Sequence, residues 1–377
     1  MRTASVASSI SARAAQIGQS AVRALLREVA AAPKPGLVDR NGSGSHSDMD
    51  FMTFADSALA LGPCFRACAR EGLERGAAKP AWAGASSRRS PVKSHPTEGD
   101  TTEVYAAEIK AADAVETLGA EAPAAETEAA DAAFLTALRL IGVEGERLMF
   151  AATGGINTHK GALFLVGLQV AAVGALIGAG IPPTADRTRR FAARVVGGVS
   201  ERELPSAATN GAAAFRAFGS RGVRGEAETA LRSLDGGALD FLIHVSERRV
   251  PNDNDCINTL LLIMARADDT TVLHRGGPEA LQLVQQGART VLEAGGMTTP
   301  AGRTSLARFS ADLVSRRISP GGSADLLAAA LFLADIEQSY AGNISGLTRP
   351  RSKRLVLYQT LSPGQTPLGI SLPLRLS

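Results

Sequence analysis

Apolar residues along this chain recur mainly at helical spacing. Phe51, Phe54, Ala55, Ala58 and Leu59 stand at i, i+3, i+4, i+7 and i+8, which predicts an amphipathic helix with one face in a core. Few β-branched or aromatic runs alternate with period two, and aromatic residues make up only 4% of the chain, so a large sheet is not expected. Segments rich in Ala and Leu, punctuated by Gly and Pro, indicate an all-α, multi-helix globular domain.

The most apolar stretch covers residues 162–175 and continues to residue 181. A helix that is apolar on every face is either a buried core helix or a membrane span. Several glycines and one glutamine make this stretch a poor span, so we expect a buried helix and no membrane association. Residues 153–161, which precede it, read Thr-Gly-Gly-Ile-Asn-Thr-His-Lys-Gly.

Residues 153–161 predict a sharp turn followed by a helix start. Gly154 and Gly155 free the backbone to turn, and Asn157 and Thr158 are residue types that cap helices. Unpaired N–H groups at a helix start attract anions, and a histidine and a lysine stand at the same point. The alternative, which a short motif leaves open, is a capped helix whose His and Lys lie in solvent.

Two polar loops in the first half of the chain have similar chemistry. Residues 33–41 follow the opening helix and are dense in Lys, Asp and Asn, and residues 44–49 add a histidine. Ser47 is expected to cap the next helix, with Asp50 at its third position as a variant of the capping box.

Two polar loops follow in the second half, before a last core helix. In residues 219–227, two arginines three apart between glycines can fork around a phosphate. Residues 268–277 again combine Asp, Thr, His and Arg before a helix. Ser323 is expected to cap the last core helix.

We expect a single helical domain over residues 1–340. Residues 76–131 are Ala-, Glu- and Asp-rich over most of their length, which predicts a disordered or weakly helical insertion without chemistry. Residues 341–377 form a basic, Pro-containing tail with no acidic residue.

Composition narrows the function classes and the compartment. The net charge of +3 is small and its basic residues are scattered, so nucleic acid is not an expected partner. Three cysteines form an odd set without metal-ligand spacing, which indicates a reducing compartment such as the cytoplasm.

Polar, ionisable helix starts at five places in one all-α chain suggest a shared crevice. Lys, Arg and carboxylates together suit a polyphosphate held with Mg²⁺, which prefers oxygen ligands. Neither a Walker loop nor a dinucleotide fingerprint occurs. The residues by themselves therefore predict an enzyme with an anionic ligand and leave its reaction open.

The motifs in their order closely resemble the triphosphoribosyl-dephospho-CoA synthase family. They are residues 33–39 (Pro-Lys-Pro-Gly-Leu-Val-Asp), 44–49 (Gly-Ser-His-Ser-Asp-Met), 153–161, 224–227 (Arg-Gly-Glu-Ala), 269–277 (Asp-Thr to His-Arg-Gly-Gly) and 319–327 (Ser-Pro-Gly-Gly-Ser-Ala-Asp-Leu-Leu). The resemblance spans about residues 20 to 340 apart from the insertion. The insertion and the basic tail depart from the family pattern.

The resemblance implies an all-helical enzyme that joins the triphosphoribosyl part of ATP to the 2′-hydroxyl of 3′-dephospho-CoA and releases adenine. The product is the prosthetic-group precursor for the acyl-carrier protein of malonate decarboxylase or citrate lyase, delivered by a further transferase. Composition and the loop at residues 269–277 favour the malonate decarboxylase branch. A homodimer is a further expectation.

The resemblance also assigns roles to residues. The expected catalytic residues are His159, His46 and Glu146, with His159 as the leading candidate for the base. The expected substrate-binding residues are Lys34, Gly154, Gly155, Asn157, Thr158, Lys160, Arg221, Arg224, His274 and Arg275. The expected Mg²⁺ ligands are Asp39, Asp48, Glu226 and Asp269. Two alternatives stay open: a nucleotide hydrolase or glycohydrolase using the same crevice, and a non-catalytic partner of a decarboxylase complex.

Overall fold

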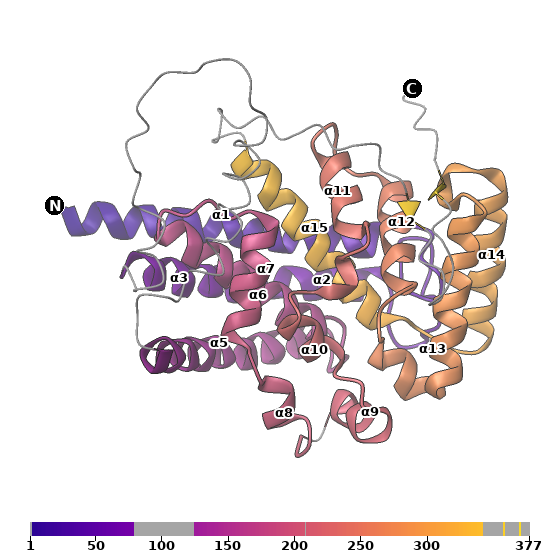
Figure 1. The fold of residues 1–377 in the computed structure, drawn as a ribbon, viewed down its shortest axis with the longest axis horizontal. Helices are drawn as coiled ribbons and strands as arrows, with labels where there is room; N and C mark the ends of the chain where they lie inside the picture. Colours follow the sequence, from indigo (N-terminus) through magenta and orange to yellow (C-terminus); the bar gives the residue numbers. More distant parts are fainter. Residues whose placement is uncertain (1, 79–123, 208, 342–356, 359–368, 371–377) are drawn as a thin grey trace, which may run out of the picture.

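A computed structural model of the protein describes residues 2–78, 124–207, 209–341, 357–358 and 369–370. Over these residues the predicted all-α class is confirmed (Figure 1). The helices of the first half are α1 (Arg2–Ala30), α2 (Phe51–Ala60), α3 (Gly62–Ala77), α5 (Ala124–Ala152), α6 (Lys160–Gly178), α7 (Ala185–Val195) and α8 (Val199–Glu203).

The second half continues the helical pattern. Its elements are α9 (Asn210–Phe218), α10 (Gly222–Glu228), η2 (Arg232–Leu234), α11 (Ala238–Ser246), α12 (Asp253–Met264), α13 (Thr270–Glu293), η3 (Gly296–Thr298), α14 (Pro300–Ser315) and α15 (Gly321–Ala341). Two strands of two residues, β1 (Leu357–Tyr358) and β2 (Gly369–Ile370), pair antiparallel.

Helix α6 is the centre of the core, as its apolar sequence predicted. It is the one described helix that is long and apolar enough to cross a membrane, and most of it is buried inside the protein. Small residues let α3 lie directly against it: a Cβ on Gly72 would stand 2.1 Å from the Ala171 carbonyl oxygen. The scarcity of aromatic residues is thus matched by close backbone packing of Gly and Ala.

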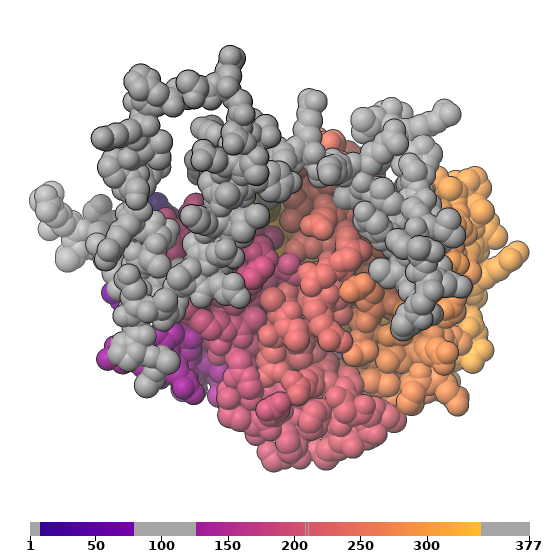
Figure 2. Space-filling view, viewed as in Figure 1, coloured from indigo at the N-terminus to yellow at the C-terminus, as the bar shows by residue number. Residues whose placement is uncertain are grey.

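Helices from opposite ends of the sequence pack together around α6. Helix α15 lies against α1, α6, α11 and α12, while α13 and α14 pack on each other at the other end of the molecule (Figure 1). In the space-filling view, the described residues change from indigo and magenta at one end to orange at the other (Figure 2). The polar loops that precede α2, α6, α13 and α15 are thereby held on packed helices.

Several predicted helix starts were wrong by a few residues. Asp50, rather than Ser47, is the N-cap of α2, where its carboxylate accepts the Thr53 N–H at 2.9 Å in a capping box. Asp269 caps α13, so the predicted loop at residues 268–277 is mostly helix. Ser323 lies inside α15, which begins at Gly321, and its N–H and hydroxyl donate to Asp269.

The amphipathic pattern of α2 was only partly right. Ala58 is fully buried as predicted, but Leu59 is 60% exposed. Ser57, a polar residue, is fully buried instead because it faces the loop before α6. Tertiary contacts, which periodicity does not encode, thus decide which residues of α2 are buried.

The predicted insertion is helical at its C-terminal end. Helix α5 begins at Ala124, and Asp131 is buried in ion pairs with Arg75 and Arg194. This end of the segment therefore anchors α5 to α3 and α7. Residues 79–123, with His95, and most of the basic tail lie outside the described residues.

Candidate active site

One crevice of about 880 Å³ gathers residues from the predicted motifs. Its walls come from the loop after α1, the turn before α6, and the first turns of α10, α13 and α15. The predicted site residues that line it are His46, Glu146, His159, Lys34, Gly155, Asn157, Thr158, Lys160, Arg224, His274, Arg275 and Asp48. The volume is at the upper end of the range for small-molecule sites.

The turn before α6 forms as its glycines predicted. Gly154 and Gly155 have φ values of 64° and 91°, in the left-handed region that favours glycine. The Thr153 hydroxyl closes the turn on the Ile156 carbonyl at 2.6 Å. Asn157 Oδ1 then accepts the Lys160 N–H at 3.3 Å, so one N–H at the helix start is already satisfied.

His159 is buried in the crevice wall. Its Nδ1 lies 2.8 Å from Ser57 Oγ, and the Phe54 ring meets it edge-on with centroids 4.9 Å apart. Its Nε2 is buried without a hydrogen-bond partner among the described residues. Burial, reinforced by the Lys34 charge, lowers the pKa of His159 to about 3. The imidazole is therefore neutral at physiological pH.

Asp325, at the start of α15, faces the start of α6. A Cβ on residue 161 would stand 2.0 Å from Asp325 Oδ2, so any residue other than glycine at position 161 would displace this carboxylate. Burial, followed by the charges of Asp269 and Glu28, raises the pKa of Asp325 well above its usual range, and the Ala162 N–H opposes this shift. The helix start that we predicted to be open for an external anion thus faces a carboxylate of the protein itself.

The cationic side chains of the crevice differ in how they are held. Lys34 is buried in an ion pair with Glu28. Lys160 is half-exposed, and its Nζ lies 2.7 Å from Glu146 Oε2. Arg275 is exposed, with one hydrogen bond to a backbone carbonyl. Lys160 and Arg275 are thus accessible to a phosphate, whereas Lys34 mainly contributes its charge.

Arg224 and His46 complete the polar wall. The Arg224 guanidinium lies 3.4 Å from a Glu203 oxygen and is partly exposed. His46 Nε2 bonds Ser319 Oγ at 2.8 Å, and Asp48 lies 3.7 Å from its other nitrogen. Burial, then the Arg275 charge, lowers the pKa of His46. His46 therefore links the loop after α1 to the segment before α15.

Asp39 and Asp269 are not brought to the crevice lining. Asp39 accepts the Lys34 N–H at 2.8 Å and the Asn41 N–H at 2.7 Å, which shapes the loop after α1. Asp269 accepts the N–H groups of Thr271 and Ser323. Both carboxylates are buried and used by the backbone, so we remove them from the proposed metal ligands.

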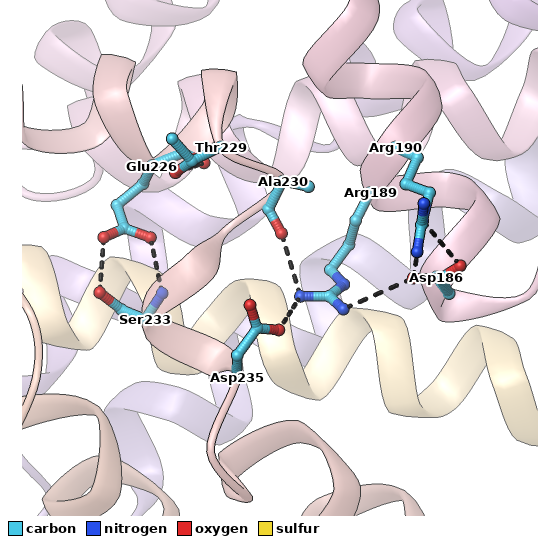
Figure 3. Close-up of polar contacts among 8 residues, drawn as sticks. All are labelled: Asp186, Arg189, Arg190, Glu226, Thr229, Ala230, Ser233 and Asp235. Atoms are coloured by element: carbon cyan, nitrogen blue, oxygen red, sulfur yellow. Dashed lines mark hydrogen bonds and ion pairs between the residues drawn. The ribbon is translucent and has the colours of Figure 1, made fainter. Parts of the chain in front are cut away.

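Glu226 does not line the crevice, and its carboxylate is bonded to Ser233 (Figure 3). Its carboxylate accepts the Ser233 hydroxyl at 2.5 Å and the Ser233 N–H at 3.1 Å. In the same region Arg189 joins Asp235 and the Ala230 carbonyl. Glu226 therefore fixes the segment after α10, and we remove it from the proposed ligands as well.

Arg221 and Gly154 also lie outside the lining. Arg221 pairs with Glu201 at 3.0 Å and with Glu228 at 3.7 Å, and of the two arginines only Arg224 lines the crevice. Gly154 shapes the turn without lining the crevice.

The described residues contain no preformed group of three metal-ligating side chains. Of the four predicted ligands only Asp48 lines the crevice, where Glu146 and Asp325 also present carboxylates. Isolated carboxylates fit Mg²⁺, which commonly binds through one or two protein oxygens together with substrate phosphates and water.

Sequence reasoning missed three residues of the site. Ser57 carries no motif and is recognised only by its contact with His159. Glu28 lies within α1 and lines the crevice beside Lys34. Asp325 stood in a motif without a role, although the glycine at position 161 was a signal that another group approaches there.

An all-helical protein with a polar crevice, accessible cations and a carboxylate of raised pKa has the features of an enzyme that acts on an anionic substrate. The model of the ATP:dephospho-CoA triphosphoribosyl transferase family matches residues 14–344. The chain belongs to this family.

Curated relatives agree with the family match. The chain is 34% identical to a probable 2-(5''-triphosphoribosyl)-3'-dephosphocoenzyme-A synthase of Pseudomonas fluorescens, over 88% of this chain and 94% of the relative. It is also 34% identical to the 2-(5''-triphosphoribosyl)-3'-dephosphocoenzyme-A synthase of Klebsiella pneumoniae, over 85% of this chain and 91% of the relative. No solved structure matches the chain.

Proposed function

We propose that this protein transfers the 5-triphosphoribosyl group of ATP to the 2′-hydroxyl of 3′-dephospho-CoA and releases adenine. Family membership supports the reaction. The structural observation that best supports this reaction is a single crevice that combines Lys160, Arg224 and Arg275 with the carboxylate of Asp325. Cations suit an intact triphosphate, and a carboxylate suits the reacting sugar.

The triphosphate is assigned to the accessible cations. Lys160 exchanges its bond to Glu146 for phosphate oxygens, and Arg224 and Arg275 supply guanidinium groups from α10 and α13. Bound Mg²⁺ would add charge neutralisation, with Asp48 as the leading ligand on the protein. The triphosphate is not cleaved in this reaction, so these groups hold and orient it.

The chemical step breaks the bond between the ribose anomeric carbon and adenine and forms a bond to the acceptor oxygen. The acceptor hydroxyl loses a proton, and the departing adenine gains one. Asp325 is our candidate proton acceptor, because its carboxylate lines the crevice and its raised pKa makes it a stronger base than an ordinary carboxylate. When ionised it also stabilises positive charge that develops on the sugar, as carboxylates do in glycosidases.

We assign the product to the acyl-carrier protein of malonate decarboxylase, with citrate lyase as the other destination. The loop at residues 269–277 and the composition support this branch. A test is to give the reaction product to the downstream transferase together with each acyl-carrier protein and to measure which one is modified. Three free, buried cysteines are compatible with the cytoplasm that we propose as its location. A homodimer stays a prediction, which light scattering tests.

The purified protein is tested with ATP, 3′-dephospho-CoA and Mg²⁺ while adenine release is measured by chromatography. Transfer requires that adenine appears only when 3′-dephospho-CoA is present and that one triphosphoribosyl adduct forms per adenine. Adenine release without the acceptor would indicate a glycohydrolase. Phosphate release would indicate a hydrolase. No turnover, together with binding to a decarboxylase subunit, would indicate a non-catalytic partner.

A further inference from the structure

Three side chains linked by hydrogen bonds, Thr158, Ser57 and His159, determine which ring nitrogen of His159 carries the hydrogen. Thr158 Oγ1 donates to Ser57 Oγ at 2.7 Å, and Ser57 Oγ lies 2.8 Å from His159 Nδ1. Ser57 is fully buried, and His159 is 2% exposed. The Ser57–His159 contact therefore forms away from bulk water, where each proton must be placed on a definite atom.

The direction of the Thr158–Ser57 hydrogen bond determines the proton positions of the other two groups. With Thr158 as the donor to Ser57, the Ser57 hydroxyl hydrogen is left to point at His159 Nδ1. Nδ1 is then the acceptor, and a neutral imidazole with an accepting Nδ1 carries its hydrogen on Nε2. In the reverse order the Thr158 hydroxyl would donate into the crevice, which Thr158 lines, and His159 would carry its hydrogen on Nδ1.

Nε2 is the atom left over by this arrangement. It is buried and has no partner in the described residues, and His159 is one of the residues that line the crevice. A buried N–H without a partner costs free energy, on the order of 1–3 kcal/mol. Phe54 packs edge-on against the ring, so the imidazole is held in place despite this cost.

We propose that Ser57 is a positioning residue that holds His159 as the Nε2–H tautomer, and that this N–H donates a hydrogen bond to ATP in the crevice. His159 is then a donor and not the base that the sequence motif predicted. The inference deepens the proposed function and rests on it for the identity of the ligand. The acceptor on ATP is either a phosphate oxygen or a ring nitrogen of the adenine.

The tautomer is tested first on the free protein, independently of activity. In protein labelled with ¹⁵N-histidine, two-dimensional NMR distinguishes the protonated nitrogen of each neutral ring from the unprotonated one. The His159 signals are assigned by their loss in His159→Gln. We expect the hydrogen on Nε2 in the wild type and a mixture of tautomers in Ser57→Ala. A hydrogen on Nδ1 in the wild type overturns the proposal, whatever reaction the protein catalyses.

The ligand atom is then tested with parts of ATP. Inorganic triphosphate and adenine are titrated separately, and the Nε2 signal is followed. A shift with triphosphate alone assigns the N–H to a phosphate oxygen, and a shift with adenine alone assigns it to the base. If ATP itself binds without changing the Nε2 signal, the donor role is wrong.

Kinetics of matched variants separate a donor from a base. The Gln side-chain nitrogen reaches the position of Nε2, whereas that of Asn reaches the position of Nδ1. We expect His159→Gln to stay within about tenfold of the wild-type kcat, and His159→Asn and His159→Ala to lose on the order of a hundredfold, the cost of one lost donor at a reacting centre.

Ser57 variants complete the kinetic test. Ser57→Ala is expected to lower kcat by about tenfold with little change in the ATP KM, since a tautomer mixture leaves only part of the enzyme competent. Ser57→Thr keeps a hydroxyl and should restore the rate. The proposal is contradicted if His159→Ala and His159→Asn are as active as the wild type. It is also contradicted if His159→Gln is as inactive as His159→Ala.

Discussion

Asp269 at the start of α13 accepts hydrogen bonds from both the N–H and the hydroxyl of Ser323 in the first turn of α15, at 2.7 and 2.9 Å. Its other oxygen accepts the Thr271 N–H at 3.0 Å. One buried carboxylate thereby holds together two helix starts that line the crevice. Asp269, which the sequence suggests as a metal ligand, therefore has a structural role: it joins the first turns of α13 and α15.

Asp269→Ala should lower the free energy of unfolding by about 2–4 kcal/mol, because it removes a helix cap and leaves buried donors without acceptors. Urea denaturation measures this change. Asp48→Ala is the matched control, since the Asp48 carboxylate is exposed in the same crevice and its loss should change stability by less than about 0.5 kcal/mol. Equal stabilities of the two variants would show that Asp269 does not clamp the helices.

Lys160→Ala should raise the ATP KM and lower kcat while stability stays nearly unchanged, because a half-exposed ion pair such as Lys160–Glu146 adds little to folding. Initial rates and a thermal melt measure the two effects. Arg147→Ala is the control: Arg147 pairs with Glu144 on the same helix as Glu146, but does not line the crevice. Unaltered kinetics in Lys160→Ala would remove this residue from the site.

We expect activity to require Mg²⁺ and Asp48→Asn to need a higher Mg²⁺ concentration for half-maximal rate. The reason is that Asp48 is the one residue lining the crevice among the four carboxylates that the sequence predicts as ligands. Rates are measured against free Mg²⁺ at constant MgATP. Glu226→Gln should leave the Mg²⁺ requirement as in the wild type, since its partner is Ser233. Full activity in excess chelator would exclude a catalytic divalent ion.

Asp325→Asn should reduce kcat by on the order of a hundredfold or more, the contribution of a general base, while the fold is retained. Gly161→Ala should reduce kcat as well. The added Cβ would stand 2.0 Å from Asp325 Oδ2 and would therefore displace the carboxylate. Gly142→Ala on α5 is the control, since a Cβ there meets nothing within 4 Å. A Gly161→Ala variant with wild-type turnover and stability would show that the carboxylate position is not critical.

Acid should destabilise the protein through His159. Its ring stays neutral in the folded state down to about pH 3, whereas in the unfolded chain it takes up a proton near pH 6.5. The unfolded state binds more protons between these values, so stability falls as the pH falls from about 6.5 toward 3. Between pH 7 and pH 5 the wild type should lose about 2 kcal/mol more than His159→Gln in urea denaturation. Parallel losses in both proteins would contradict a buried, neutral His159.

The sequence by itself determined the helical class, the buried apolar helix α6 and the set of motifs whose residues line the crevice. These follow from local causes: helical spacing of apolar residues, a double glycine that permits positive φ, and a strongly apolar stretch with no polar face. Such signals depend on neighbouring residues in the chain, and they can therefore be recognised without knowledge of the fold. The family resemblance rests on the same loops, which is why the reaction was predictable from them.

Only the tertiary structure decided what each polar side chain does. Asp39, Asp48, Glu226 and Asp269 are chemically equivalent candidates in the sequence, yet three of them hold backbone groups or Ser233 while Asp48 lines the crevice. The Ser57–His159 contact joins residues 102 positions apart, and Asp325 meets Gly161 across an even longer separation. Burial and hydrogen-bond partners set the protonation and the availability of these groups, and both arise from contacts that no local pattern records.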